Sequence, residues 1–139
     1  MLTRLAFLDE ILKKEGCPYI WAAKGPDKFD CSGLITWAIR ECGGPDWRFS
    51  NGSSAHLFDK LKPTDDPEPG DLIFYGPPHK VTHVMVYWGD GRCYGATGGD
   101  STTVSVEMAN RRGARVRFRA KVKYRPDFRG FRRLPIREE

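Results

Sequence analysis

The sequence predicts an α+β fold for a single domain that covers residues 1–139. In the first 61 residues, apolar side chains recur at helical spacing, whereas later segments alternate β-branched and aromatic residues with polar ones, as strands do. Helices followed by an antiparallel sheet are typical of the α+β class. A chain with 40% hydrophobic and 29% charged residues can form one hydrophobic core, and this composition excludes a disordered chain.

Three helices are expected in the N-terminal part of the chain, over residues 3–15, 31–42 and 53–61. Thr3 precedes the first apolar-periodic segment and Asp30 precedes the second, and both residue types are favoured as N-caps. Glycines follow both segments, as is usual where helices end. The third helix is expected to be short, and an exposed position on it suits His56 better than a functional role.

Strands are expected in the C-terminal part, where β-branched and aromatic residues are enriched. They are placed near residues 71–75, 83–88, 92–97, 103–107, 115–124 and 128–133. A Gly-Asp-Gly turn at residues 89–91 joins two of them into a hairpin. The Pro- and Asp-rich segment 63–70 reads as a connector within one domain.

Cys31 is the candidate nucleophile, because it falls in the first turn of the second predicted helix. The free N–H groups and the positive end of the helix dipole favour a thiolate there and should lower the thiol pKa from about 8.5, an effect that Asp30 opposes. His83 begins the later hairpin, and a cysteine at a helix start with a histidine on a strand is a common nucleophile–base pair. The alternative is a buried cysteine that only packs.

Four ordered blocks resemble the NlpC-type cell-wall peptidases, which are papain-like cysteine enzymes. The blocks are Pro18–Ala23, Phe29–Leu34, Pro69–Phe74, and His83–Tyr87 with Gly89-Asp90-Gly91. This resemblance implies an NlpC-type fold in which the helix bearing Cys31 packs on the sheet carrying His83. It also implies that Cys31 is the nucleophile and His83 the base, and that Tyr19, Asp30 and Ser32 line the site and meet the substrate peptide.

The resemblance is broken at two places. The family usually carries a third polar residue, often His, about twelve positions after the catalytic His, and Gly95 stands there. A three-residue turn at 89–91 would place Thr97 opposite His83, so Thr97 or a water is expected to hold the ring. Relatives that cleave next to D-glutamate often carry an arginine in the segment that corresponds to residues 51–56, and this chain has none there. The bond that is cut therefore stays open.

Neither a metal nor a cofactor is expected. The chain contains no Cys-x-x-Cys pair, and the cysteines other than Cys31 read as packing residues. His79 and His83 have a spacing that suits a metal on a helix, but Pro77-Pro78 favours a loop that runs into a strand.

Every odd position from Arg115 to Arg125 is basic, with apolar or small residues between. On a strand, this period would place six cations on one face. The face is either a solvated sheet edge or a surface that binds a polyanion, such as a phosphate-rich wall polymer or nucleic acid.

The function expected from the sequence is hydrolysis of amide bonds in peptidoglycan stem peptides through an acyl-enzyme on Cys31. Two alternatives are a papain-like acyltransferase or thioesterase, and a catalytically weak module that binds polyanions or the wall. No apolar run reaches the length of a membrane span, and the first fifteen residues do not resemble a signal peptide. A phage virion-associated enzyme, with a phage tail as partner, or an effector delivered to the wall by a secretion machine would reconcile these features.

Overall fold

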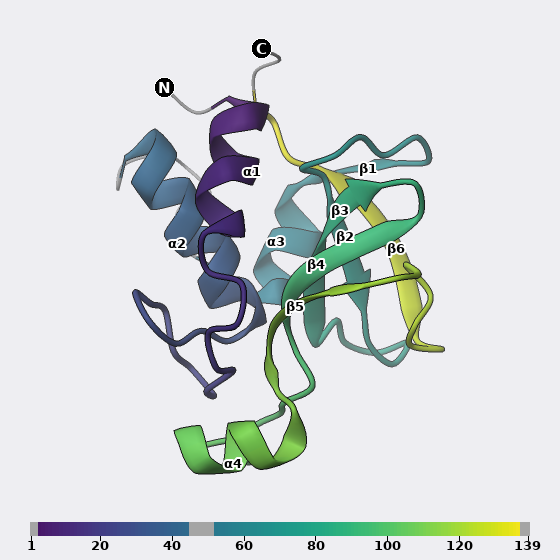
Figure 1. Ribbon diagram of the computed structural model, residues 1–139. Helices are drawn as coiled ribbons and strands as arrows, with labels where there is room; N and C mark the ends of the chain where they lie inside the picture. Colours follow the sequence, from purple (N-terminus) through teal and green to yellow (C-terminus); the bar gives the residue numbers. More distant parts are fainter. Residues whose placement is uncertain (1–2, 45–51, 137–139) are drawn as a thin grey trace.

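The computed structural model describes residues 3–44 and 52–136 and has the α+β architecture that the sequence predicts. Three helices lie to one side of a sheet, and a fourth projects beyond the sheet's lower end in Figure 1. The helices are α1 (Arg4–Leu12), α2 (Cys31–Gly43), α3 (Ser54–Lys60) and α4 (Val106–Arg112). None of these described helices has the length and apolar character that a membrane crossing requires.

The sheet has six antiparallel strands in the order β1-β6-β2-β3-β4-β5. The strands are β1 (Lys62–Thr64), β2 (Leu72–Tyr75), β3 (His83–Gly89), β4 (Arg92–Thr97), β5 (Arg115–Arg119) and β6 (Phe128–Arg133). The predicted hairpin is confirmed, because β3 pairs with β4 and the turn residues 89–91 all have positive φ. Two glycines in this turn therefore avoid the strain that a side chain would bring.

The strand predicted near residues 103–107 is wrong. Residues 106–112 form α4, for which Ser105 is the N-cap, and its Oγ accepts a hydrogen bond from the Met108 amide at 3.1 Å. Gly113 ends the helix in the left-handed conformation. The β-branched residues before α4 suggested a strand, but the Ser cap and the terminal glycine decide the local structure. Segment 63–70, expected to be a connector throughout, also contains most of β1.

The long basic strand predicted over 115–124 is also wrong, because β5 ends at Arg119. Only three of the six cations share one sheet face, since Arg115, Arg117 and Arg119 lie opposite consecutive odd residues of β4. The chain then leaves the sheet edge, and the Val122 carbonyl accepts a hydrogen bond from Tyr75 Oη at 2.7 Å. Residues 120–127 therefore cross the sheet face that lies away from the helices.

Two apolar clusters lie on opposite faces of the sheet. The larger one packs α1, α2 and α3 against the sheet and includes Phe7, Leu34, Ile39, Leu57, Phe74, Val84, Val86 and Tyr94. The smaller one consists of Ile73, Tyr75, Met85 and Cys93, and it is covered by Val122, Tyr124, Phe128 and Phe131. His83 alternates with Val84, so its ring belongs to the side of the smaller cluster.

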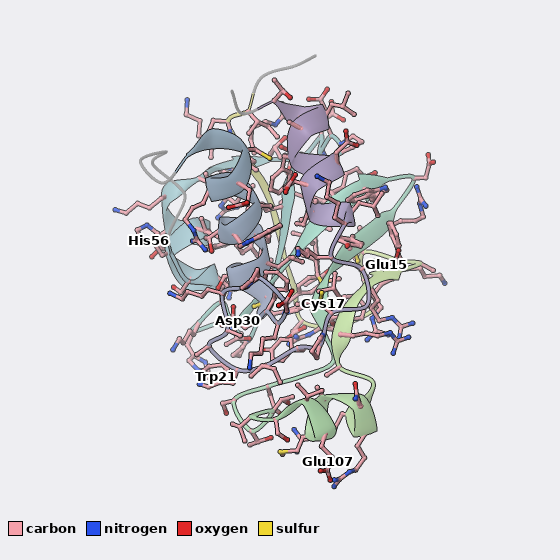
Figure 2. All side chains as sticks on the ribbon, turned by 60° about the vertical axis from the view of Figure 1, so that its left-hand side comes forward. Glu15, Cys17, Trp21, Asp30, His56 and Glu107 are labelled. Atoms are coloured by element: carbon pink, nitrogen blue, oxygen red, sulfur yellow. The ribbon has the colours of Figure 1, made fainter. Side chains whose placement is uncertain are left out.

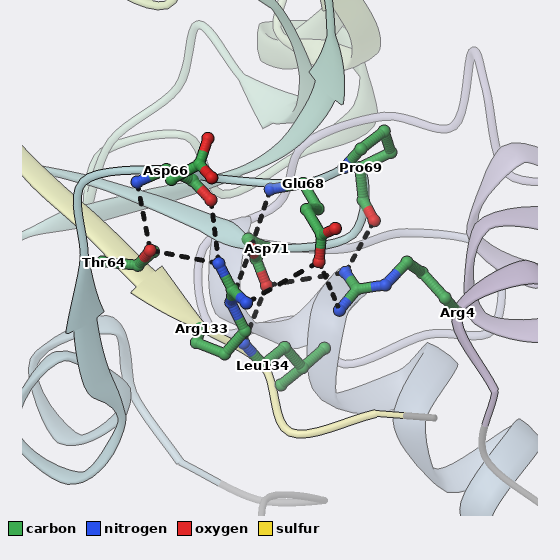
Figure 3. Close-up of polar contacts among 8 residues, drawn as sticks. All are labelled: Arg4, Thr64, Asp66, Glu68, Pro69, Asp71, Arg133 and Leu134. Atoms are coloured by element: carbon green, nitrogen blue, oxygen red, sulfur yellow. Dashed lines mark hydrogen bonds and ion pairs between the residues drawn. The ribbon is translucent and has the colours of Figure 1, made fainter. Parts of the chain in front are cut away.

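A buried ionic cluster joins α1, the segment before β2 and the end of β6 (Figure 3). The Asp71 carboxylate is fully buried and lies 3.5 Å from Arg4 Nη1 and 3.1 Å from Arg133 Nε. It also accepts hydrogen bonds from the amides of Glu68 and Leu134. A buried carboxylate with this many partners stabilises the fold only as a complete set, because removing one partner leaves a charge uncompensated.

Candidate active site

The start of α2 holds Cys31 in a locally determined conformation. Asp30 is the N-cap, as predicted, and its Oδ1 accepts hydrogen bonds from the Gly33 amide at 2.6 Å and from Ser32 Oγ at 3.5 Å. The Asp30 amide donates to the Ala23 carbonyl at 2.8 Å. A Cβ on Gly33 would lie 2.2 Å from that same carbonyl oxygen, so only glycine permits this approach. Figure 2 shows Asp30 at this end of α2, with Trp21 on the loop beside it.

The Cys31 thiol is almost completely buried, with 7% of the residue exposed. Burial raises its pKa to about 11, and the Asp30 carboxylate raises it further, while the amide of Val84 and those of the helix start favour the thiolate. The lowered pKa predicted from the helix terminus is therefore wrong, because loss of hydration outweighs the backbone N–H groups. The contact with the Val84 amide places the sulfur at the beginning of β3.

His83 is the residue before Val84, and 6% of it is exposed. Its Nε2 lies 2.8 Å from Tyr124 Oη. Burial lowers the pKa of the imidazole to about 3, and the nearby Arg125 lowers it further, whereas Asp127 raises it. At neutral pH, both shifts favour the uncharged forms, a neutral imidazole and a neutral thiol.

Thr97, expected to hold the His83 ring, contacts a different side chain. Its Oγ1 lies 2.8 Å from Tyr124 Oη, so Tyr124 stands between Thr97 and His83. Tyr124 was not predicted as a site residue, because the alternating pattern after Arg115 placed it on the buried face of a strand. Gly95 was a signal only that the ring partner had to be another residue or a water, and it did not identify Tyr124.

Tyr19 is also close to Cys31, and its burial raises the pKa of the phenol, as do the charges of Cys31 and Asp30. The phenol therefore stays protonated. Its ring packs against Gly99, where a Cβ would lie 2.3 Å from Tyr19 Cδ1. The Tyr19 amide donates to the Ala114 carbonyl at 3.0 Å, which fixes the loop that carries it.

An open cleft of about 430 Å³ lies beside these residues. Its lining includes Tyr19, Trp21, Lys80, His83, Asp100 and Arg125, and Cys31 does not line it. Trp21 is half exposed on one wall, and Arg125 makes a two-point ion pair with Asp127 at 2.9 and 2.6 Å. The cleft offers an aromatic wall and charges of both signs, which suits a polar peptide chain.

The described residues contain no group of three His, Cys, Asp or Glu side chains that could hold a metal ion. His79 lies in the exposed turn before β3, so it does not form a helical pair with His83. His56 is exposed on α3, away from Glu15 and Cys17 in Figure 2. Asn51, the first residue of the segment considered for an arginine, lies outside the described residues.

Comparisons with known proteins relate this chain to one family of sequences and structures. The sequence profile of the NlpC/P60 family matches residues 16–121. The bifunctional muramidase/DL-endopeptidase CwlT of Bacillus subtilis is 35% identical over 91 residues, which cover 63% of this chain and 27% of CwlT. The probable endopeptidase Cgl2188 of Corynebacterium glutamicum is 38% identical over 90 residues, which cover 64% of this chain and 41% of Cgl2188. The chain thus spans less than half the length of these relatives.

Solved structures show the same fold. NlpC1 from Trichomonas vaginalis superposes with a TM-score of 0.71 at 27% identity, over 91% of this chain and 42% of NlpC1. RipD from Mycobacterium tuberculosis superposes with a TM-score of 0.68 at 21% identity, over 94% of this chain and 96% of RipD. RipD is described as a non-catalytic NlpC/p60 domain protein adapted to a peptidoglycan-binding function, so the fold alone does not establish catalysis.

Proposed function

This chain belongs to the NlpC/P60 family, and from that premise we propose that residues 1–139 form one cysteine endopeptidase domain that hydrolyses amide bonds in peptidoglycan stem peptides. The observation that carries the proposal is the position of the Cys31 sulfur, which contacts the amide of Val84 directly after His83. The names of the related endopeptidases support the same activity.

The chemistry begins from a neutral pair. As the Cys31 sulfur attacks the amide carbonyl carbon, its proton passes to Nδ1 of His83, because Nε2 is occupied by Tyr124. The proton then goes to the leaving amine as the C–N bond breaks, and a thioester to Cys31 remains. Water attacks this acyl-enzyme with His83 again as base, which releases the acid and restores the thiol.

Oxyanion stabilisation in this scheme comes from the Cys31 amide, which already points at the sulfur, and from the protonated phenol of Tyr19. Asp30 and Ser32 meet the substrate peptide from the helix start. Asp30 has a structural part as well, since its carboxylate caps α2. A substitution of Asp30 would therefore affect folding and binding together.

Two other activities use the same residues differently. An acyltransferase would form the same acyl-enzyme but transfer the acyl group to an acceptor other than water. A thioesterase would form the acyl-enzyme from a thioester substrate. A binding module would need neither Cys31 nor His83, and keeping both buried in one place favours catalysis. Hydrolysis is the proposal because it needs no acceptor besides water and agrees with the names of the relatives.

The decisive experiment incubates the purified protein with peptidoglycan and identifies the released fragments by mass spectrometry. We expect stem-peptide fragments with a new free carboxyl group, and none from Cys31→Ala, whose fold is checked by circular dichroism. Fragments joined to an added amine would indicate acyl transfer instead. Sedimentation with the wall without any release would support the binding module.

A second surface suits an accessory role in binding. The side chains of Arg115, Arg117 and Arg119 share one face of the edge strand β5, and none of the three makes an ion pair with an acidic residue in the part of the chain that the structure describes. Arg119 and Arg115 lower the pKa of Arg117 by repulsion. We propose that this cationic face binds an anionic wall polymer and thereby concentrates the enzyme on its substrate.

A further inference from the structure

We propose that Tyr124 and Thr97 are positioning residues that select the tautomer of His83 in which Nδ1 can accept a proton. In this arrangement Nε2–H donates to Tyr124 Oη, and Tyr124 donates its own proton to Thr97 Oγ1. The inference rests on the proposed function only for its kinetic consequence, because the tautomer itself can be measured without any substrate.

The geometry supports a chain of two hydrogen bonds. Tyr124 Oη lies 2.8 Å from His83 Nε2 and 2.8 Å from Thr97 Oγ1. A phenol has a single proton, so it can donate to only one of these partners. If it donates to Thr97, its lone pair faces Nε2–H and the proton-free nitrogen is Nδ1. If it donates to Nε2, Nδ1 carries the proton and His83 cannot act as base.

Thr97 can either accept from Tyr124 or donate to it, and in the proposed chain it has the acceptor role. An acceptor at Oγ1 lets the phenol donate away from His83, and the imidazole then completes the chain as donor. Nε2–H remains a donor after His83 has accepted the proton of Cys31, so the same contact holds the ring before and after proton transfer. A base fixed in this way needs no reorganisation during the reaction.

Gly95 explains why the partner comes from outside the strand. Gly95, on β4, lies opposite Arg117 of β5. A Cβ at position 95 would lie 2.8 Å from Met85 Sδ. A larger residue at position 95 would therefore have to displace Met85. Tyr124 instead reaches His83 from the segment 120–127, which lies over the sheet face.

Contacts on both sides hold that segment in place. The Val122 amide donates to the Gly91 carbonyl at 2.8 Å, and the Val122 carbonyl accepts from Tyr75 Oη at 2.7 Å. Farther along, the Gly76 amide donates to the Asp127 carbonyl at 2.9 Å. The Arg119 guanidinium lies 4.9 Å above the Tyr124 ring. Tyr124 thus sits between two anchored points, as a positioning residue requires.

Three variants test the inference. Tyr124→Phe removes the hydroxyl and keeps the ring, and Thr97→Val removes the acceptor at nearly constant shape. For both, we expect kcat on a stem peptide to fall about tenfold to a hundredfold, with KM nearly unchanged, because losing the orientation of the base costs less than the roughly 10²–10⁴-fold that the base itself contributes. Thr97→Ser retains an acceptor and should keep most of the wild-type turnover.

The second readout is the tautomer of His83, measured from its ring nitrogen shifts by NMR near neutral pH. The wild type should carry the proton on Nε2, and Thr97→Val should shift it toward Nδ1 because the phenol turns to donate to the imidazole. Thr97→Ser should behave as the wild type does. These spectra need no substrate, so they remain decisive even where Tyr124→Phe fails to fold.

The outcomes separate the two proposals. A wild-type protein that releases no peptide but carries the Nε2–H tautomer overturns the peptidase and leaves the positioning chain intact. An active wild type whose turnover and tautomer are unchanged in Thr97→Val overturns the positioning chain and leaves the peptidase intact. A wild-type ring protonated on Nδ1 also overturns the positioning chain.

Discussion

Protonation of His83 should contribute to the loss of stability of this protein in acid. The ring is buried, and its pKa lies at about 3 against an ordinary value of 6.5. At about 1.4 kcal/mol per pH unit, this difference corresponds to a contribution on the order of 5 kcal/mol. Because the folded-state pKa is the lower one, the contribution is complete above pH 6.5 and disappears as the pH falls toward 3. By pH 4, about 3 kcal/mol should be lost.

Urea unfolding at pH 7 and pH 4 measures this loss, and the variant His83→Gln isolates it. Glutamine keeps a side-chain N–H for Tyr124 but does not titrate. The loss of stability between pH 7 and pH 4 should therefore be about 3 kcal/mol smaller in His83→Gln than in the wild type. Acidic groups distant from His83 contribute equally to both proteins and cancel in the difference, whereas Asp127, which interacts with His83, adds a smaller term. His56→Gln is the matched control, because His56 is exposed on α3.

Parallel losses of stability in the wild type and in His83→Gln would refute the reasoning, since His83 would then be free to take up a proton in the folded state. That result would also affect the mechanism. A ring that titrates near its ordinary value would be partly protonated at neutral pH, and the neutral pair with Cys31 would not describe the resting site.

Further predictions concern the thiol, the ionic cluster and the cationic face. Burial raises the pKa of the Cys31 thiol to about 11, so its alkylation by iodoacetamide should be slow at pH 7. The alkylation rate, measured by mass spectrometry, should rise about tenfold per pH unit up to pH 10. Asp71→Ala should lower the unfolding free energy by about 3–5 kcal/mol, measured in urea, because Arg4 and Arg133 lose a buried partner; a loss below about 1 kcal/mol would contradict this. Arg117→Glu should reduce salt-sensitive sedimentation with walls but leave hydrolysis of a soluble stem peptide unchanged; sedimentation that ignores both salt and charge would refute the surface role.

The features that the sequence predicted correctly have local causes. Asp30 caps α2 through a hydrogen bond to the amide three residues later, and such a cap needs only neighbouring residues. The turn at 89–91 likewise depends on its own two glycines. From these two signals alone, Cys31 is placed at a helix start and His83 at the start of a hairpin.

The features that the sequence did not predict depend on distant segments. The raised pKa of Cys31 comes from burial beneath other elements, and no pattern around residue 31 reports how deeply the thiol lies. The end of β5 is similar, because the alternation of basic and apolar residues continues after Arg119 while the chain leaves the sheet. Periodicity describes what a strand would bury and not whether the strand persists.

The contact between Tyr124 and His83 depends on a distant segment, and it bears on whether the site is catalytic. Judged from the sequence, Gly95 suggests a family member that has lost the residue orienting its base. In the structure, His83 Nε2 has a partner supplied by another segment. A buried imidazole nitrogen needs such a partner in any stable fold, so the contact with Tyr124 alone would fit a binding module equally well. The distinguishing test is the other ring nitrogen, because a proton-free Nδ1 next to Val84 is what the proposed proton transfer from Cys31 requires and a binding module does not need.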